Sequence, residues 1–175
     1  VLSLRDGTVS VTYEFLAGQI ELNPTFDQPN LAGLILPQSC KYVDDYAFAG
    51  AKNMKFIDLG GVQYIGREAF NNSACESIVL PDSVRFVGSN AFSAPSIKAI
   101  HLNDGLRVLD EGAFFTYGKG KGVTIPASVA YIGYQAFGYC PVDPENPFGG
   151  LTKIGGFVIR GATGTAAQTY AVANE

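Results

Sequence analysis

Long apolar runs are absent from this chain of 175 residues. The longest, Leu31 to Leu36, is far shorter than the roughly 20 residues that span a bilayer, so we expect no membrane insertion of this segment. Charged residues are scarce, at 16% against about 25% in an average protein. The formal net charge of −4 argues against nucleic acid as a partner, because nucleic-acid binders usually present a basic face.

Methionine is also nearly absent, since Met54 is the only one. The chain starts at Val1 without the basic and apolar series of a secretion signal, so we expect a trimmed or mature piece. What is abundant is apolar residues, at 47%, with 21 glycines and 9 prolines. This composition excludes a disordered chain and predicts frequent turns. The length fits one domain, over residues 1–175.

The dipeptide Ala-Phe recurs at a fixed period, with spacings of 22, 22, 22 and 23 residues. Its five copies are Ala47-Phe48, Ala69-Phe70, Ala91-Phe92, Ala113-Phe114 and Ala136-Phe137. A degenerate copy around Phe26 precedes them, so residues 24–159 hold about five and a half repeats. A fixed period of this length is the mark of a solenoid, in which stacked units bury each other's apolar residues.

Other positions repeat with the dipeptide. An aliphatic residue stands four before each alanine, and Asp or Gly stands three before it, as in Asp44 and Gly66. Because Gly and Asp tolerate a positive φ, we predict a forced turn at that position. Apolar alternation after each phenylalanine predicts one half-buried strand per turn. These strands are expected at Ile57-Asp58-Leu59, Ile78-Val79-Leu80, Ile100-His101-Leu102 and Val123-Thr124-Ile125.

The repeat predicts a mainly β solenoid with one parallel sheet and short 3₁₀ or single-turn helical pieces around each Ala-Phe. The two ends differ from the repeat. Residues 1–23 do not align, and the segments Val1–Leu4 and Thr8–Phe15 predict a β-hairpin that caps the N-terminal end. At the other end, the alanine-rich residues 160–175 predict a capping helix that Thr163 or Thr165 begins. Ala166 and Tyr170 would then share the face that packs on the last turn.

The unit Val-x-x-Ile-Gly-x-x-Ala-Phe, followed by Ile-x-Leu-Pro, resembles the BspA-like leucine-rich-repeat family of bacterial surface proteins. The stretch from Ile125 to Cys140 follows the family pattern nearly position by position, and Ile159 to Ala171 looks like its capping helix. The resemblance covers about three quarters of the chain. It implies a leucine-rich-repeat solenoid, a right-handed β/α superhelix with a parallel concave sheet. The insertion from Pro141 to Gly150 and the glycine-rich turn from Tyr117 to Gly122 depart from the pattern.

Residues that carry chemistry are few and scattered. His101 is the only histidine and lies in a variable strand position, so we expect a solvated side chain. Cys40, Cys75 and Cys140 fall where the repeat has small or apolar residues, and no Cys-x-x-Cys is present. Buried thiols are the prediction, and a disulfide between any two is the alternative. We therefore expect no catalytic residues, no metal and no cofactor.

Two surfaces are candidates for binding a partner. The first is the outward face of the predicted strands, expected to be one continuous surface without Lys or Arg. Its residues are Phe56, Asp58, Ser77, Val79, Ala99, His101 and Thr124. The second is an aromatic ladder five residues before the alanines: Tyr42, Tyr64, Phe86 and Tyr131, with Val108 in the same position. The ladder is either an exposed stripe or an internal stack that stiffens the solenoid.

The resemblance implies a secreted or cell-surface location and binding to host or bacterial macromolecules. The resulting hypothesis is a non-enzymatic module that mediates protein or glycan adhesion. The alternative is an architectural spacer within a larger surface protein. An exposed aromatic or apolar patch favours binding, whereas a uniformly polar surface favours the spacer.

Overall fold

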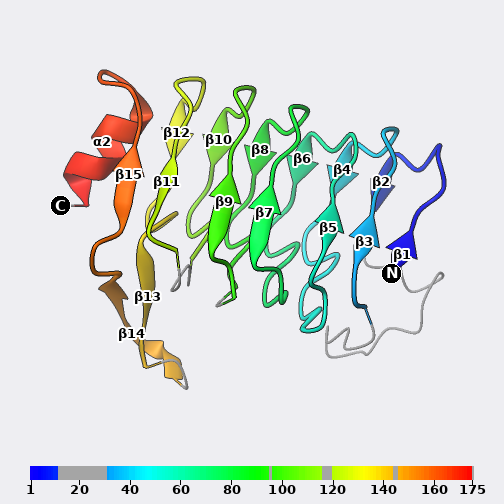
Figure 1. Cartoon of the computed structure of the whole chain (residues 1–175), viewed down its shortest axis with the longest axis horizontal. Helices are drawn as coiled ribbons and strands as arrows, with labels where there is room; N and C mark the ends of the chain where they lie inside the picture. Colours follow the sequence, from blue (N-terminus) through cyan, green and yellow to red (C-terminus); the bar gives the residue numbers. More distant parts are fainter. Residues whose placement is uncertain (12–30, 95, 116–119, 144–145, 175) are drawn as a thin grey trace.

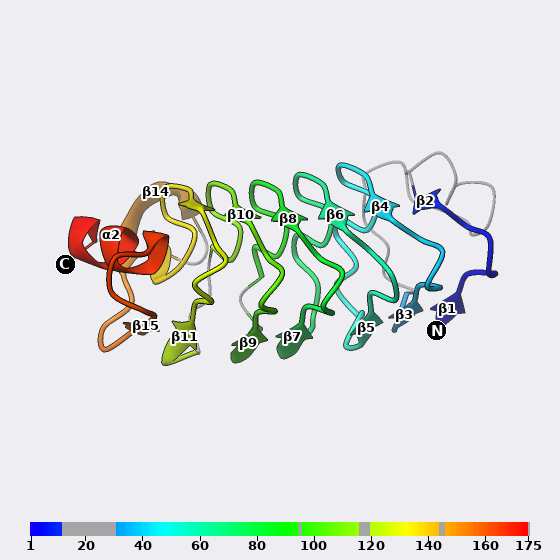
Figure 2. The same cartoon turned by 90° about the horizontal axis from the view of Figure 1, so that it is seen from above.

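The computed structural model describes residues 1–11, 31–94, 96–115, 120–143 and 146–174. Over these ranges the chain coils into a solenoid whose turns stack side by side along the long axis (Figure 1). Each regular turn contributes two short strands rather than the one that we predicted. The strands form two rows on opposite sides of the coil (Figure 2), and the apolar core lies between the rows.

The first row is a continuous parallel sheet of six strands in which strands from successive turns pair with each other. Each strand has only two residues, which is too short for alternation to be visible in the sequence, and the prediction missed the whole row. Its strands are β2 (Ser10–Val11), β4 (Tyr42–Val43), β6 (Tyr64–Ile65), β8 (Phe86–Val87), β10 (Val108–Leu109) and β12 (Tyr131–Ile132).

The second row contains the strands that the alternation predicts, and their positions are confirmed. They do not form the single sheet that we expected, because the pairing is broken at two places in the described chain. One group is β1 (Leu2–Ser3), β3 (Leu34–Ile35) and β5 (Ile57–Asp58); the next is β7 (Ser77–Val79) with β9 (Ala99–His101); the last is β11 (Gly122–Thr124) with β15 (Val158–Arg160). All three groups are parallel.

The N-terminal segment is not the predicted hairpin. β1 pairs in parallel with β3, and β2 pairs in parallel with β4, so the two strands belong to different rows. Each strand adds one strand to the end of a row, so its backbone pairs with β3 or β4 and not with the other strand of a hairpin. Residues 1–11 thus form part of a further solenoid turn, and the rest of the predicted hairpin, residues 12–15, lies outside the described residues.

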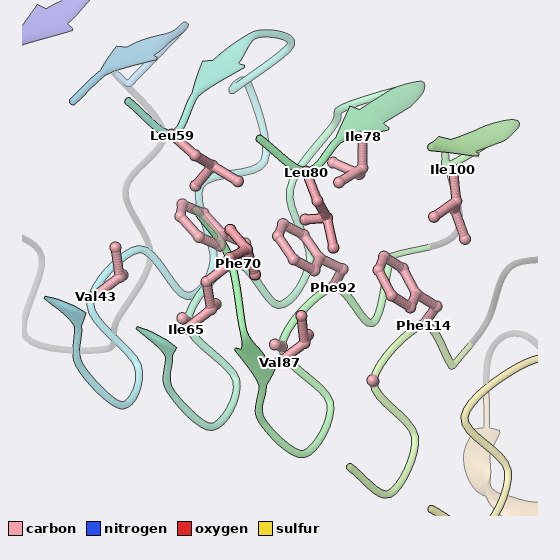
Figure 3. Packing of buried hydrophobic residues seen from close by; sticks show 14 of the residues in the cluster. Val43, Leu59, Ile65, Phe70, Ile78, Leu80, Val87, Phe92, Ile100 and Phe114 are labelled. Carbon is pink, nitrogen blue, oxygen red and sulfur yellow. The ribbon is translucent and has the colours of Figure 1, made fainter. Parts of the chain in front are cut away.

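The core is built around a column of stacked phenylalanines, one from each Ala-Phe (Figure 3). Successive rings are nearly parallel, within 8°, and their centroids lie 5.1–5.3 Å apart. Aliphatic side chains such as Val87 from the first row and Leu80 from the second enclose the column. The column consists of Phe48, Phe70, Phe92, Phe114 and Phe137, all of them buried.

The Ala-Phe segments are turns, not the predicted 3₁₀ or helical pieces. Backbone hydrogen bonds also join them from turn to turn, as from Phe70 N–H to the Ala91 carbonyl at 2.8 Å. The positive φ lies at the residue directly before each alanine, for example Glu68 at 52° and Asn90 at 54°. Gly133, three residues before Ala136, is required for another reason: a Cβ there would lie 2.4 Å from the backbone nitrogen of Glu111 in the preceding turn.

Two elements complete the C-terminal end (Figure 1). The insertion forms an antiparallel hairpin of β13 (Tyr139–Asp143) and β14 (Asn146–Lys153), which projects away from the turns. Helix α2 (Ala166–Ala173) covers the last turn through Ala167 and Tyr170, rather than through the predicted pair with Ala166. Thr165 is its N-cap residue, but its side chain accepts no hydrogen bond from the N–H groups of the first turn, and its hydroxyl instead donates to the carbonyl of Ala162.

Candidate binding surfaces

The predicted strand-face residues are divided between two clefts. The first cleft, of about 810 Å³, lies where β5 and β7 fail to pair. Phe56 and Val79 are the large apolar side chains at its rim, with exposed fractions of 52% and 62%. Prediction from sequence included Asp58 but missed Lys55 and Glu76, because these two residues precede the strands. Its lining includes Lys55, Phe56, Asp58, Glu76, Ser77 and Val79.

The second cleft, of about 480 Å³, lies between β9 and β11, where the second row is broken again. It brings together Ala99, His101 and Thr124, the remaining members of the predicted set. The expectation that this face carries no Lys or Arg is wrong, because β15 brings Arg160 beside β11, and two lysines lie directly before β9 and β11. Lys98, Lys121 and Arg160 also line this cleft, with Asp104 as a carboxylate.

The aromatic ladder lies on the outer face of the six-stranded sheet, which rules out the internal stack. Register pairs Tyr42 with Tyr64, Tyr64 with Phe86, and Val108 with both Phe86 and Tyr131. The exposed fractions are 47% for Tyr42, 37% for Tyr64 and 54% for Tyr131. Val43, Ile65, Val87 and Leu109 point inward and are fully buried, as alternation requires, and their counterpart Ile132 in β12 is partly buried.

Within the ladder, Tyr64 and Phe86 stack face to face, with ring centroids 4.6 Å apart and planes within 3°. Burial in this stack raises the pKa of Tyr64, and the carboxylates of Asp45, Asp44 and Asp110 raise it further. Three acidic groups therefore act on one edge of the ladder.

The cations on the other edge of the ladder are engaged by the protein itself. The ammonium of Lys41 donates to the carbonyls of Gln38 and Gly61, at 2.6 and 3.4 Å. The guanidinium of Arg107 donates to the carbonyl of Ser128 at 3.0 Å. These bonds tie neighbouring loops together.

The cysteines follow the buried-thiol prediction only in part. All three are free, and Cys40 and Cys75 are buried, but Cys140 is half-buried. The inserted hairpin is the cause, since it places Cys140 on β13, outside the column of turns. Among the described residues no cluster of three or more His, Cys, Asp or Glu side chains is arranged to hold a metal ion. Nor does the described chain contain a helix long and apolar enough to cross a membrane.

A family model supplies the identity of the repeat. Six copies of the BspA type leucine rich repeat region match residues 22–142. The chain belongs to the BspA-type leucine-rich-repeat family. This finding agrees with the repeat period, the stacked turns and the parallel strands described above. No curated protein matches the sequence significantly.

Solved structures of similar fold include the pneumococcal vaccine antigen PcpA, at 26% identity and a TM-score of 0.58. The match covers 73% of this chain and 34% of PcpA, so the chain spans about a third of that protein's length. A leucine-rich repeat protein from Bacteroides ovatus matches over 74% of this chain and 38% of its own, at 21% identity and a TM-score of 0.51. A leucine rich cell surface protein from Faecalibacterium prausnitzii has 22% identity and a TM-score of 0.44, over 61% and 36% of the two chains.

Proposed function

We propose that this BspA-type repeat domain is a non-enzymatic binding module that attaches to a protein partner through the aromatic ladder. The observation that carries the proposal is the exposure of Tyr42, Tyr64 and Tyr131 on the one sheet that continues without a break from β2 to β12. Solvent-exposed aromatic side chains on a regular sheet are costly to leave uncovered, and aromatic residues are favoured anchors at protein interfaces.

The packing of the rings favours a protein over a glycan. Sugars bind aromatic residues by lying flat on a ring face, but the facing sides of Tyr64 and Phe86 are covered by their mutual stacking at 4.6 Å. What this pair offers to a partner is a ridge of ring edges. A ridge with acidic groups along one edge suits a protein surface with apolar and basic side chains.

A location outside the cell is part of the proposal. PcpA is described as a vaccine antigen and the Faecalibacterium prausnitzii protein as a cell surface protein. The family membership and the antigen's description support secretion or display at the surface. Adhesion is the role that fits a binding module in that setting.

The test is to immobilise the domain and to measure binding to a panel of purified extracellular-matrix proteins and to a glycan array. The ladder variant carries Tyr42→Ser, Tyr64→Ser and Tyr131→Ser together. Its matched control is Tyr134→Ser, which changes another exposed tyrosine outside the ladder. We expect binding to a protein that the ladder variant loses and the control keeps, with both variants still cooperatively folded.

Other outcomes separate the alternatives. Binding that survives in the ladder variant but is lost in Phe56→Ala with Asp58→Lys would move the site to the strand face of the first cleft. Binding to glycans alone would contradict the protein partner. A domain that binds neither panel, while a partner is found for the rest of the parent protein, would favour the architectural spacer.

A further inference from the structure

The break between β5 and β7 leaves two strand edges that face each other across the first cleft. β5 pairs with β3 and β7 pairs with β9, but no backbone hydrogen bond joins residues 56–59 to residues 76–80. The sequence explains the break. Two residues separate Leu59 from Val62, whereas three separate Leu80 from Val84, so the turn that carries β5 closes one residue early.

Two glycines accommodate this short closure by packing on the preceding turn. A Cβ on Gly60 would lie 2.1 Å from the carbonyl oxygen of Leu36, and one on Gly61 would lie 2.0 Å from that of Gln38. Only glycine permits so close an approach of two backbones. This contact draws the β5 turn toward β3 and opens space on its β7 side.

The backbone groups along the cleft are therefore oriented for pairing but unpaired. In β7 the even-numbered residues face β9: Glu76 accepts from Ala99 at 3.1 Å, and Leu80 donates to His101 at 2.9 Å. Because backbone groups alternate in direction along a strand, those of Ser77 and Val79 face the cleft. A strand edge of this kind is a template for another extended chain.

The floor of the cleft is apolar and incompletely covered. Ile57 occupies the position that Leu34 and Ile78 hold in their own turns, where both are buried. Ile57 remains partly exposed because no strand lies against it on the β7 side. Phe56 and Val79 flank it at the rim, so an apolar side chain that enters the cleft meets apolar surface on three sides.

We propose that the cleft binds an extended peptide segment of a protein, which adds as a strand to the free edge of β7. The backbone N–H and carbonyl of Val79 and the carbonyl of Ser77 are the groups that pair with it, and alternate side chains of the peptide pack on Ile57 and Phe56. A helix does not fit this site, because its backbone groups are bonded internally. The cleft and the aromatic ladder lie on opposite rows of strands, so either site can fail without the other (Figure 2).

The experiment starts from a display library of random heptapeptides, selected on the folded domain. Selected peptides are synthesised, and their affinity is measured by calorimetry. We expect N-methylation of every second peptide amide to weaken binding about tenfold, the scale of one lost hydrogen bond, with little effect at the intervening amides. This period of two is specific to strand addition.

Variants of the domain test the edge itself. Val79→Pro removes the N–H that faces the cleft and leaves the bonds to β9 in place, so we expect about tenfold weaker binding. Val79→Thr keeps this N–H and a β-branched side chain, and is expected to bind as the unaltered domain does. If Val79→Pro does not fold, the N-methyl scan on the unaltered domain still decides whether the peptide binds as an added strand.

Three results would overturn the proposal. One is a library that yields no peptide with a dissociation constant below about 1 mM. Another is an N-methyl scan without a period of two. The third is a set of peptides whose binding survives Val79→Pro but is lost in the ladder variant, which would leave the proposed function intact and remove the cleft site.

Discussion

The hydroxyl of Tyr170 makes two hydrogen bonds to the backbone of Phe137, accepting from its N–H and donating to its carbonyl, both at 2.9 Å. In earlier turns the N–H of the core phenylalanine donates to an alanine carbonyl of the next turn, as from Phe114 to Ala136 at 3.0 Å. No Ala-Phe turn follows Phe137. The side chain of α2 thus supplies the partner that a further turn would have supplied.

Replacing Tyr170 with phenylalanine is expected to lower the free energy of unfolding by about 1–3 kcal/mol, because the buried N–H of Phe137 loses its partner while ring packing is kept. Urea titration measures the change. Tyr131→Phe removes an exposed hydroxyl and should cost less than about 0.5 kcal/mol. Equal stability of the two variants would mean that the Tyr170 bonds do not hold the cap.

Alkaline pH should weaken the same contact. Burial raises the pKa of Tyr170 to about 12, from an ordinary value of 10.0. Between these values the unfolded chain loses the proton and the folded chain keeps it, so this contribution to stability is complete below about pH 10 and declines as the pH rises toward 12. The stability difference between the unaltered domain and Tyr170→Phe should therefore shrink from pH 8 to pH 11. A stability difference that is constant over this pH range would contradict the raised pKa of Tyr170.

The phenylalanine column predicts a large cost for a cavity in the middle of the solenoid. Phe92 is fully buried between Phe70 and Phe114, with ring centroids at 5.1 and 5.3 Å. Phe92→Ala should lower the free energy of unfolding by about 3–5 kcal/mol, since neighbours on both sides face the void. Phe56→Ala, at an exposed phenylalanine, is the matched control and should cost less than about 1 kcal/mol. A loss that small at Phe92 would refute its central place in the core.

The core could be predicted from the sequence because each buried position recurs in every turn. Phe70, for example, belongs to a repeated Ala-Phe pair, Ile65 stands four residues before the alanine of that pair, and both are fully buried. The strand at Ile78 was visible because its neighbours alternate with it. Repetition gives the same signal several times, and this is why the family and the fold class follow from residues alone.

Features set by contacts between turns could not be predicted in the same way. The position of Gly133 suggests a positive φ, but its cause is the backbone of Glu111, which only the stacking brings within 2.4 Å. The break beside β5 likewise depends on how Gly60 and Gly61 pack on another turn. Orientation of the ladder was ambiguous because a two-residue strand such as Tyr64–Ile65 has no alternation to read.

The three thiols are expected to differ in reactivity. Burial raises the pKa of Cys75 to about 11, and its thiol contacts the Met54 carbonyl at 3.1 Å. Burial also raises the pKa of Cys40, and the thiolate is the reactive form. Cys140 is half-buried on the projecting hairpin. A chromogenic thiol reagent at pH 8 should therefore react quickly with one equivalent of thiol in the native domain and slowly with two.

Denaturation without reductant should release three reactive equivalents, because all three cysteines are free. Cys140→Ser should abolish the fast phase and leave both slow thiols unchanged, which identifies the hairpin residue as the accessible one. Three slow thiols in the native domain would mean that the hairpin shields Cys140. A single equivalent after denaturation would reveal a disulfide and would contradict the three free thiols.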